Sequence, residues 1–145
     1  MHIYRHRHWL PLERNASRPD LAQRDVLRSI VSANRTTTFG REHGFAEIDS
    51  ARRFGERVPV QQYETLRPYI ERQRRTGQTE LTAEAPLFYA QTSGTTGTPK
   101  YIPITRTSLA MQRGQQALFS YLQFRACPSA FDGMAMGIMG AAVEG

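Results

Sequence analysis

The sequence QTSGTTGTPK occupies residues 91–100, and the expected fold follows from this stretch and from what flanks it. Five of its side chains carry a hydroxyl group, two positions are glycine and one is lysine, whereas none is acidic. Glycine adopts positive φ readily, so backbone N–H groups at Gly94 and Gly97 can turn toward an anion. The hydroxyl groups add donors, and Lys100 adds a compact positive charge. This composition predicts a loop that holds phosphate, although a polar hairpin tip without a ligand is the plainer alternative.

Strands are predicted on both sides of this loop. Residues 87–90 (LFYA) have the apolar composition of a buried strand that enters the loop, and residues 101–104 (YIPI) form the strand that leaves it. At such a turn a backbone nest and side chains would hold the anion, rather than a helix N-terminus. Pro103 indicates an edge or a bulge in the second strand. The residues expected to contact phosphate are Thr92, Ser93, Gly94, Thr95, Thr96, Gly97 and Lys100.

Three better-known loops are excluded by single residues. A Walker A loop that starts at Gly94 requires glycine where Pro99 stands and Ser or Thr where Tyr101 stands. Dinucleotide-binding loops and kinase glycine loops require a G-x-G pattern, which is absent here. A nucleophile elbow on Ser93 requires glycine two residues before and two residues after it.

Composition and charge favour a small acidic ligand. The chain has 145 residues, a net charge of +6, a pI near 10.1 and a mean hydropathy of -0.53, so we expect no transmembrane segment. No acidic residue occurs between Glu84 and Asp132, a segment that contains Lys100 and three arginines, Arg106, Arg113 and Arg125. We therefore expect the excess positive charge to surround the loop. A basic nucleic-acid-binding protein remains the alternative.

The first residues and the single cysteine carry no predicted chemistry. Residues 1–16 are predicted to be a flexible basic tail, because they lack the apolar segment of a signal peptide and their three histidines lack nearby partner ligands. Cys127 is the only cysteine, which excludes an internal disulfide and fits a reducing compartment such as the cytoplasm. No catalytic residue and no protein metal ligand is predicted.

The first half of the chain is predicted to be helical. Ser17 is expected to cap a helix that runs to about Ala33, and Ser50 a short helix to about Glu56. Helical turns are expected from Tyr63, followed by a separate helix that begins at Pro68 and stops at Gly77. Residues 39–45 form a turn-rich piece, in which His43 is expected to make a structural polar contact.

The second half completes an α/β pattern. A long helix is expected from a cap at Thr105 or Thr107 to about Arg125, and residues 134–139 are predicted to be a buried strand. Two or three strands and one long helix do not complete a covered sheet, so the sheet is incomplete. We therefore expect residues 17–145 to be the N-terminal portion of a larger domain, and we expect the isolated chain to expose apolar surface.

The loop resembles the signature loop of the adenylate-forming enzyme superfamily. The sequence YIPIT that follows Lys100 narrows the resemblance to the auxin-responsive promoter family of acyl acid-amido synthetases, because acyl-coenzyme A ligases usually place glycine after this lysine. Three further blocks of the chain, at residues 34–45, 58–70 and 131–145, resemble the same family. The resemblance extends from about Ala22 to Gly145.

The resemblance implies an activity and its cofactors. The family activates a small carboxylic acid with ATP and magnesium, and it then transfers the acyl group to an amine or amino acid. The predicted loop would hold the phosphates of ATP, while magnesium ligands are expected outside this chain. We expect no nucleic-acid or membrane partner. Because the family's later motifs are missing, we expect the chain alone to be inactive, and a non-catalytic remnant remains a further alternative.

Overall fold

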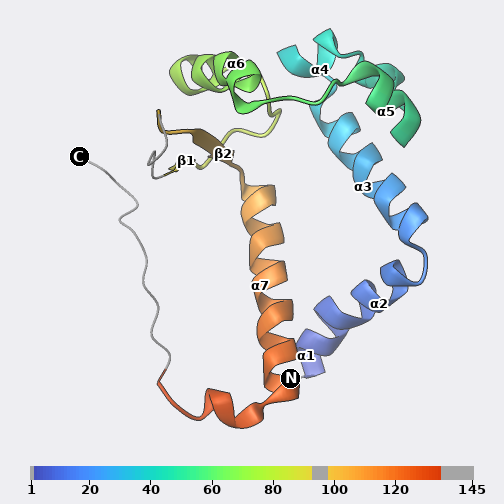
Figure 1. The fold of residues 1–145 in the computed structure, drawn as a ribbon, viewed down its shortest axis with the longest axis vertical. Helices are drawn as coiled ribbons and strands as arrows, with labels where there is room; N and C mark the ends of the chain where they lie inside the picture. The colour runs from blue at the N-terminus through green and yellow to red at the C-terminus, as the bar shows by residue number, and fades with distance from the viewer. Residues whose placement is uncertain (1, 93–97, 135–145) are drawn as a thin grey trace.

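The computed structural model describes residues 2–92 and 98–134 and is mostly helical (Figure 1). One antiparallel pair of strands, β1 and β2, interrupts the helices. In chain order the elements are α1 (His2–Tyr4), the π-helical turn η1 (Arg5–Trp9), α2 (Leu10–Ala16), α3 (Pro19–Asn34), α4 (Thr38–Glu42), the 3₁₀ turn η2 (Phe45–Glu47), α5 (Ala51–Arg57), α6 (Tyr63–Thr76), β1 (Phe88–Gln91), β2 (Tyr101–Ile104), α7 (Arg106–Ala126) and the 3₁₀ turn η3 (Pro128–Phe131).

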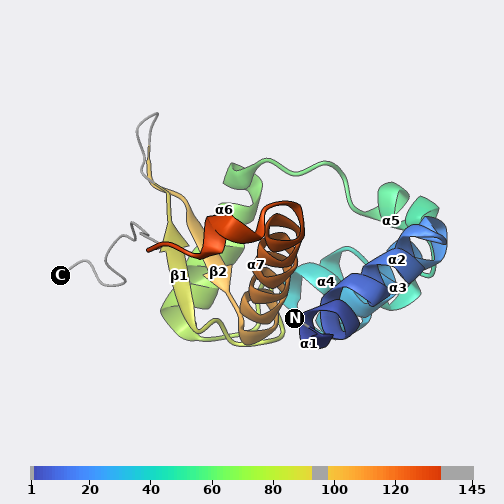
Figure 2. The same ribbon diagram turned by 90° about the horizontal axis from the view of Figure 1, so that it is seen from below.

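Two long helices set the length of the molecule. Helices α3 and α7 run in the long direction of the molecule, and α4 to α6 and the hairpin lie at one end (Figures 1 and 2). At the other end α1 lies beside α7, and α2 leads from there to α3. The predicted α/β class with an incomplete sheet is confirmed by this arrangement. The predicted strand over residues 134–139 lies outside the described residues, except for Met134.

The helical end of the molecule packs around aromatic side chains. Val31 of α3, Phe39 of α4, Phe45 and Ile48 form a buried cluster. The Phe39 ring meets the Phe45 and Tyr69 rings edge to face, with centroids 5.9 and 5.4 Å away. Edge-to-face contacts add to the burial of apolar area, so these rings fix how α4 and α6 pack together.

A buried threonine makes the tight turn between α3 and α4. The Thr37 hydroxyl donates to the Asn34 carbonyl at 2.8 Å and accepts the Gly40 N–H at 2.9 Å. It thereby caps α4 while joining it to the end of α3. Gly40 is required because a Cβ there would lie 2.1 Å from the Asn34 carbonyl oxygen.

A buried amide ties α6 to the segment that leads toward the hairpin. The Gln73 Oε1 accepts the N–H groups of Leu81 and Thr82 at 2.8 and 3.1 Å, and its Nε2 donates to the Thr82 hydroxyl at 2.6 Å. Gln73 is only 3% exposed. These bonds fix the path of the chain between α6 and β1.

Two predicted helix boundaries are wrong. Ser17 does not cap α3, because its hydroxyl donates to the Arg14 carbonyl at the end of α2, and Arg18 precedes α3 with no side-chain cap. The separate helices predicted at Tyr63 and Pro68 form one helix, α6, with Pro68 inside it. Pro68 removes one hydrogen bond near the helix start, and the packing of α6 preserves the helix across it. Gly77 ends α6 at a φ of 71°, as predicted.

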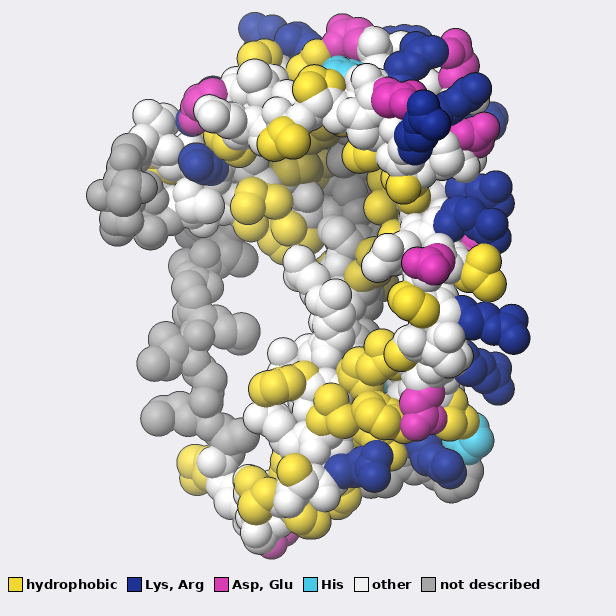
Figure 3. All heavy atoms as spheres, turned by 45° about the vertical axis from the view of Figure 1, so that its right-hand side comes forward, with side chains coloured by type: hydrophobic (Ala, Val, Ile, Leu, Met, Phe, Trp, Pro, Cys, Tyr) yellow, Lys and Arg dark blue, Asp and Glu magenta, His cyan; other side chains and the backbone are white. Residues whose placement is uncertain are grey.

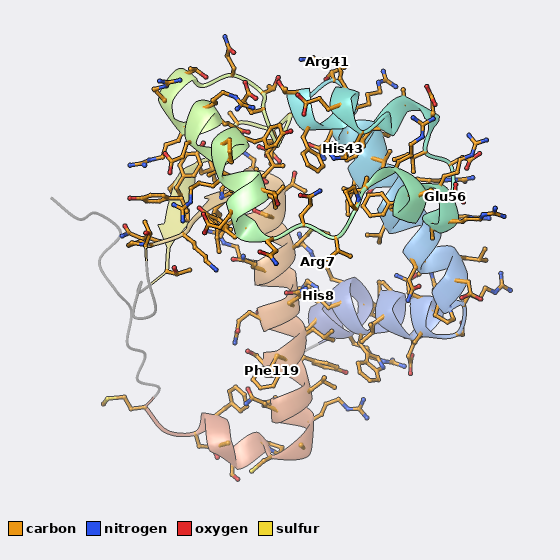
Figure 4. The ribbon with its side chains drawn as sticks, turned by 45° about the horizontal axis from the view of Figure 1, so that its top comes forward. Arg7, His8, Arg41, His43, Glu56 and Phe119 are labelled. Atoms are coloured by element: carbon orange, nitrogen blue, oxygen red, sulfur yellow. The ribbon has the colours of Figure 1, made fainter. Side chains whose placement is uncertain are left out.

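The first sixteen residues differ locally from the predicted tail. Residues 2–16 are helical, and the segment contacts α7. The Trp9 ring lies 6.4 Å from the Tyr121 ring, and the Arg125 guanidinium lies 5.6 Å from the Trp9 ring. Figure 4 shows His8 beside α7, where a Cβ at Gly114 would lie 3.9 Å from the imidazole. The predicted flexibility of this segment stays a prediction.

Apolar side chains remain exposed on several elements. Figure 3 shows hydrophobic side chains around the hollowed face, with Lys and Arg along its outer edge. Phe88, Ile102, Met111 and Phe119 are each about half exposed. Within residues 2–92 and 98–134, no helix combines the length and the apolar character that crossing a membrane requires.

Candidate functional site

The hairpin carries the predicted phosphate loop between its two strands. Residues Phe88 to Gln91 pair in register with Ile104 to Tyr101. One further pair closes the base of the loop: the Thr92 N–H donates to the Lys100 carbonyl at 3.1 Å, and the Lys100 N–H donates to the Thr92 hydroxyl at 3.1 Å. Thr92 and Lys100 therefore face each other across the base. The other predicted site residues, Ser93, Gly94, Thr95, Thr96 and Gly97, lie outside the described residues.

Both described site residues present polar groups to solvent. The side chains of Thr92 and Lys100 are exposed. The Thr92 hydroxyl accepts the Lys100 N–H, and this bond leaves its hydrogen able to donate to a ligand oxygen. The base of the loop thus offers a hydroxyl donor and an ammonium group on opposite strands.

In the structure Tyr63 also contacts the base of the loop, although its sequence context predicts only the start of a helix. Tyr63 is the first residue of α6, and its hydroxyl accepts the Tyr101 N–H at 2.7 Å and donates to the Tyr101 carbonyl at 3.2 Å. Its ring lies beneath Lys100, whose Nζ is 5.4 Å from the ring centroid. That distance is within the range of a cation–π contact. The hydrogen bonds between Tyr63 and Tyr101 join residues 38 positions apart, and no local sequence pattern signals them.

The surroundings of Lys100 include an acidic side chain, contrary to the acid-free environment inferred from the sequence. Glu64 of α6 accepts two hydrogen bonds from the Arg67 guanidinium, at 2.7 and 3.0 Å. These bonds, with the charges of Arg67 and Lys100, hold the pKa of Glu64 below its usual value. The Arg67 guanidinium also lies 4.9 Å from the Tyr63 ring centroid. Lys100 therefore sits beside a paired carboxylate and a second cation.

The expected concentration of cations around the loop is only partly found. Helix α7 leads away from the hairpin (Figure 1), and its rise of about 1.5 Å per residue puts Arg125 roughly 28 Å beyond Arg106. Arg125 rests on Trp9 instead. Arg113 lines a cavity of about 810 Å³ between α7 and the N-terminal helical segment, together with Arg7, His8 and Arg106. Of the four cations predicted near the loop, Lys100 is the one at its base.

Capping fixes the helix that follows the hairpin. The Thr105 hydroxyl accepts the Ser108 N–H at 3.1 Å, and the Ser108 hydroxyl accepts the Thr105 N–H at 2.9 Å. The Glu84 carboxylate accepts the Thr107 N–H, with oxygen distances of 3.2 and 3.3 Å. Hydrogen bonds from Thr107 hold the pKa of Glu84 below its usual value. The connection from β2 into α7 is thereby held at both its backbone and its side chains.

The remaining chemically interesting residues have structural explanations. The His43 Nδ1 lies 2.9 Å from the Phe39 carbonyl, and the imidazole stacks on the Phe39 ring at 3.9 Å, which confirms a structural polar contact (Figure 4). Cys127 is exposed, and a hydrogen bond with the Ser129 hydroxyl lowers the pKa of its thiol. Among the described residues, no group of three or more His, Cys, Asp or Glu side chains is arranged to hold a metal ion.

Comparison of the sequence with known proteins gives matches to one family. The GH3 family N-terminal domain matches residues 11–145. The chain is 31% identical over 105 residues to the indole-3-acetic acid-amido synthetase GH3.15 of Arabidopsis thaliana, covering 71% of this chain and 18% of the relative. It is 33% identical over 103 residues to the probable indole-3-acetic acid-amido synthetase GH3.13 of Oryza sativa subsp. japonica, covering 64% of this chain and 22% of the relative. The chain spans about one fifth of the length of both relatives.

Proposed function

The chain belongs to the GH3 family, and from this premise we propose that it supplies the ATP phosphate-binding loop of an enzyme that joins a carboxylic acid to an amine. One structural observation supports the proposal most directly. The Thr92 hydroxyl and the Lys100 ammonium face each other at the end of the hairpin, where the hydroxyl-rich and glycine-rich sequence leaves and re-enters the described residues. The assignment of residues 17–145 to one portion of a larger domain is part of the same proposal.

In the proposed reaction, a carboxylate oxygen attacks the α-phosphorus of ATP. The bond to pyrophosphate breaks, and its electron pair leaves with the pyrophosphate oxygen. The amine nitrogen then attacks the acyl carbon and loses a proton. The bond between the acyl carbon and AMP breaks, which leaves the amide and free AMP. Both amido synthetase relatives carry names for amide formation from indole-3-acetic acid. For this chain we propose only the substrate classes, a small carboxylic acid and an amine or amino acid.

The residues at the loop base fit a polyphosphate. Lys100 supplies a positive charge that opposes the charge growing on the departing pyrophosphate, and Thr92 supplies a hydroxyl donor. The proposal gives Ser93, Thr95 and Thr96 the same donor role, and Gly94 and Gly97 the role of presenting backbone N–H groups. Glu64 is already paired with Arg67, so its charge is partly offset before a phosphate arrives.

The described residues do not supply a ligand set for magnesium. Hard cations of this kind prefer oxygen ligands, with carboxylates foremost among protein groups. The Glu64 carboxylate, which the charge of Lys100 reaches, is already hydrogen-bonded to Arg67. We therefore assign no magnesium ligand to these residues. A cytoplasmic location and the lack of a nucleic-acid partner stay predictions.

Binding of ATP to wild-type and variant chains tests the proposal. A hydrogen bond to a charged group contributes about 1.5–3 kcal/mol, so Lys100→Ala should weaken ATP binding roughly tenfold to a hundredfold in calorimetric titration. Lys100→Arg should recover only part of the loss, because the guanidinium is larger and directs its donors differently.

Arg113→Ala is the matched control, since this cation lines the cavity beside α7 and not the loop. An equal loss at Arg113 and Lys100 would show that only a diffuse positive field attracts ATP. Binding of nucleic acid that ATP does not compete away would instead favour the alternative of a basic nucleic-acid-binding protein.

A further inference from the structure

We propose that Tyr63 is a positioning residue for Lys100, which fixes both the exit strand of the loop and the ammonium group at its base. This inference rests on the proposed function. Tyr63 belongs to α6 and is far from the loop in sequence, yet it reaches the two residues at the loop exit, Lys100 and Tyr101. It uses its hydroxyl for Tyr101 and its ring for Lys100.

The hydroxyl takes the place of a neighbouring strand. In an antiparallel pair, successive residues direct their N–H and C=O groups to opposite edges. The Lys100 and Ile104 carbonyls accept bonds from the β1 side of the hairpin, so the backbone groups of Tyr101 point to the outer edge. The Tyr63 hydroxyl bonds to both of these groups, at 2.7 and 3.2 Å. This anchors the strand one residue after Lys100.

A second side chain of α6 holds the same strand residue. The Arg74 guanidinium, three helical turns beyond Tyr63, lies 4.1 Å from the Tyr101 ring centroid. Tyr101 is therefore held through its backbone by Tyr63 and through its ring by Arg74. The position of β2 relative to α6 is fixed at both points, which makes α6 the reference against which the loop exit is placed.

The ring of Tyr63 then limits where the lysine side chain can lie. A lysine on an exposed strand end samples many rotamers, and ordering them on binding reduces affinity. The contact of Nζ with the ring face at 5.4 Å favours one side of the hairpin. The Arg67 guanidinium lies 4.9 Å from the same ring centroid and is paired with Glu64. The ammonium is thus placed before a phosphate binds.

The sequence makes this inference directly testable, because Lys100 is the only lysine in the chain. Reductive methylation with ¹³C-formaldehyde labels its amine and keeps the positive charge. The α-amino group is labelled as well, and its signal is the one that remains in Lys100→Arg. The methyl chemical shift of Lys100 then reports contact with an aromatic ring, and pyrophosphate serves as the probe ligand.

Two variants separate the ring from the hydroxyl. In the wild-type chain and in Tyr63→Phe, the Lys100 methyl signal should be shifted upfield by the ring, and in Tyr63→Leu that shift should be lost. Tyr63→Phe should weaken pyrophosphate binding about threefold to tenfold through the lost hydroxyl bonds. Tyr63→Leu should weaken it a further twofold to fivefold through the lost ring contact.

Tyr69→Phe is the matched control on the same helix, because its hydroxyl bonds to Glu42 away from the loop. It should change neither the methyl shift nor the pyrophosphate affinity. If pyrophosphate perturbs the wild-type Lys100 signal and both Tyr63 variants retain full affinity, the positioning role is overturned while the proposed function stands. If pyrophosphate leaves the wild-type signal unchanged, the proposed function fails and this inference fails with it.

Discussion

Gly40 lies where any side chain would collide with the end of α3. A Cβ at this position would be 2.1 Å from the Asn34 carbonyl oxygen and 3.0 Å from the Thr37 hydroxyl oxygen. Both neighbours are fixed by the hydrogen bonds of the Thr37 hydroxyl, so moving them aside would weaken these bonds. We expect Gly40→Ala to lower the free energy of unfolding by about 1–3 kcal/mol in urea titrations.

Gly55→Ala is the control for this substitution. Gly55 lies inside α5 with nothing within 4 Å of its Cβ position, so alanine should raise stability by up to about 1 kcal/mol through helix propensity. Equal effects at the two glycines would contradict the argument from the close approach at Gly40.

Glu80 gives the molecule a predictable dependence on pH. Its carboxylate accepts two bonds from the Arg72 guanidinium, at 2.9 and 3.1 Å, and these hold the pKa of Glu80 below its usual 4.5. Since the unfolded chain takes up the proton first as pH falls, the stabilisation is complete well above 4.5 and is lost as pH falls through the folded-state pKa. Glu80→Gln should therefore destabilise the chain at pH 7, and the difference should shrink at acidic pH.

Denaturant titrations at several pH values measure this difference. Glu56→Gln serves for comparison, because Glu56 pairs with Arg52 on an exposed face of α5 and surface pairs contribute little (Figure 4). A Glu80 effect that stays constant from pH 7 to pH 3 would rule out the ion pair as its cause.

At the scale of elements, the start of α7 depends on its capping box. Thr105 is 7% exposed and exchanges hydrogen bonds with Ser108. Thr105→Ala should destabilise the chain by about 1 kcal/mol, measured as a lower midpoint in thermal or urea unfolding. Gln115→Ala on the exposed middle of α7 should have almost no effect. If the two substitutions had equal effects, general helix propensity would explain the result better than capping.

Elements whose signals are local were predicted from the sequence. The cap at Ser50 is confirmed, and of the two caps predicted for α7, Thr105 or Thr107, the structure has Thr105. The bounds of β2 and the stop at Gly77 are confirmed as well. These features depend on side chains that bond to backbone within three residues, or on one glycine. Ser17 misled because a serine that follows one helix can cap it or begin the next, and its hydroxyl bonds backward to Arg14.

The composition of residues 92–100 predicts where a phosphate-binding loop would lie in the sequence. The partners of Lys100 come from α6, and Tyr63, Glu64 and Arg67 carry no pattern that relates them to this lysine. Arg113 and Arg125 are not near the loop, because α7 carries them far along its axis. A stretch of sequence without acidic residues therefore does not form a single positive patch. Lys100 and its partners on α6 become neighbours only when the chain folds, so the sequence alone does not show that they are close.

At the scale of the whole molecule, the exposed apolar surface should make the chain bind hydrophobic dyes. Val26 and Ile30 of α3 are about half exposed, and they line a groove of about 480 Å³ with Leu27 and Phe54. Exposed apolar patches of this kind mark contact surfaces. We expect enhanced dye fluorescence under native conditions, and we expect the paired substitutions Val26→Thr and Ile30→Thr to reduce it.

Val60→Thr is the control for the dye experiment, since Val60 is fully exposed and does not line this groove. It should leave the fluorescence unchanged. A chain that unfolds cooperatively and binds no dye would show that the exposed side chains do not form a usable apolar surface.

The bond from Tyr63 to Tyr101 also has a consequence for the order of folding. The hairpin pairs residues close in sequence, which is a fast and local event, whereas the Tyr63 hydroxyl closes a segment of 38 residues. Loop-closure entropy must be overcome before that bond forms, and the intervening chain is held by the Gln73 amide bonds. We therefore expect the lysine to reach its final place late, after the helical half has assembled, so a hairpin formed alone would not yet hold Lys100 against Tyr63.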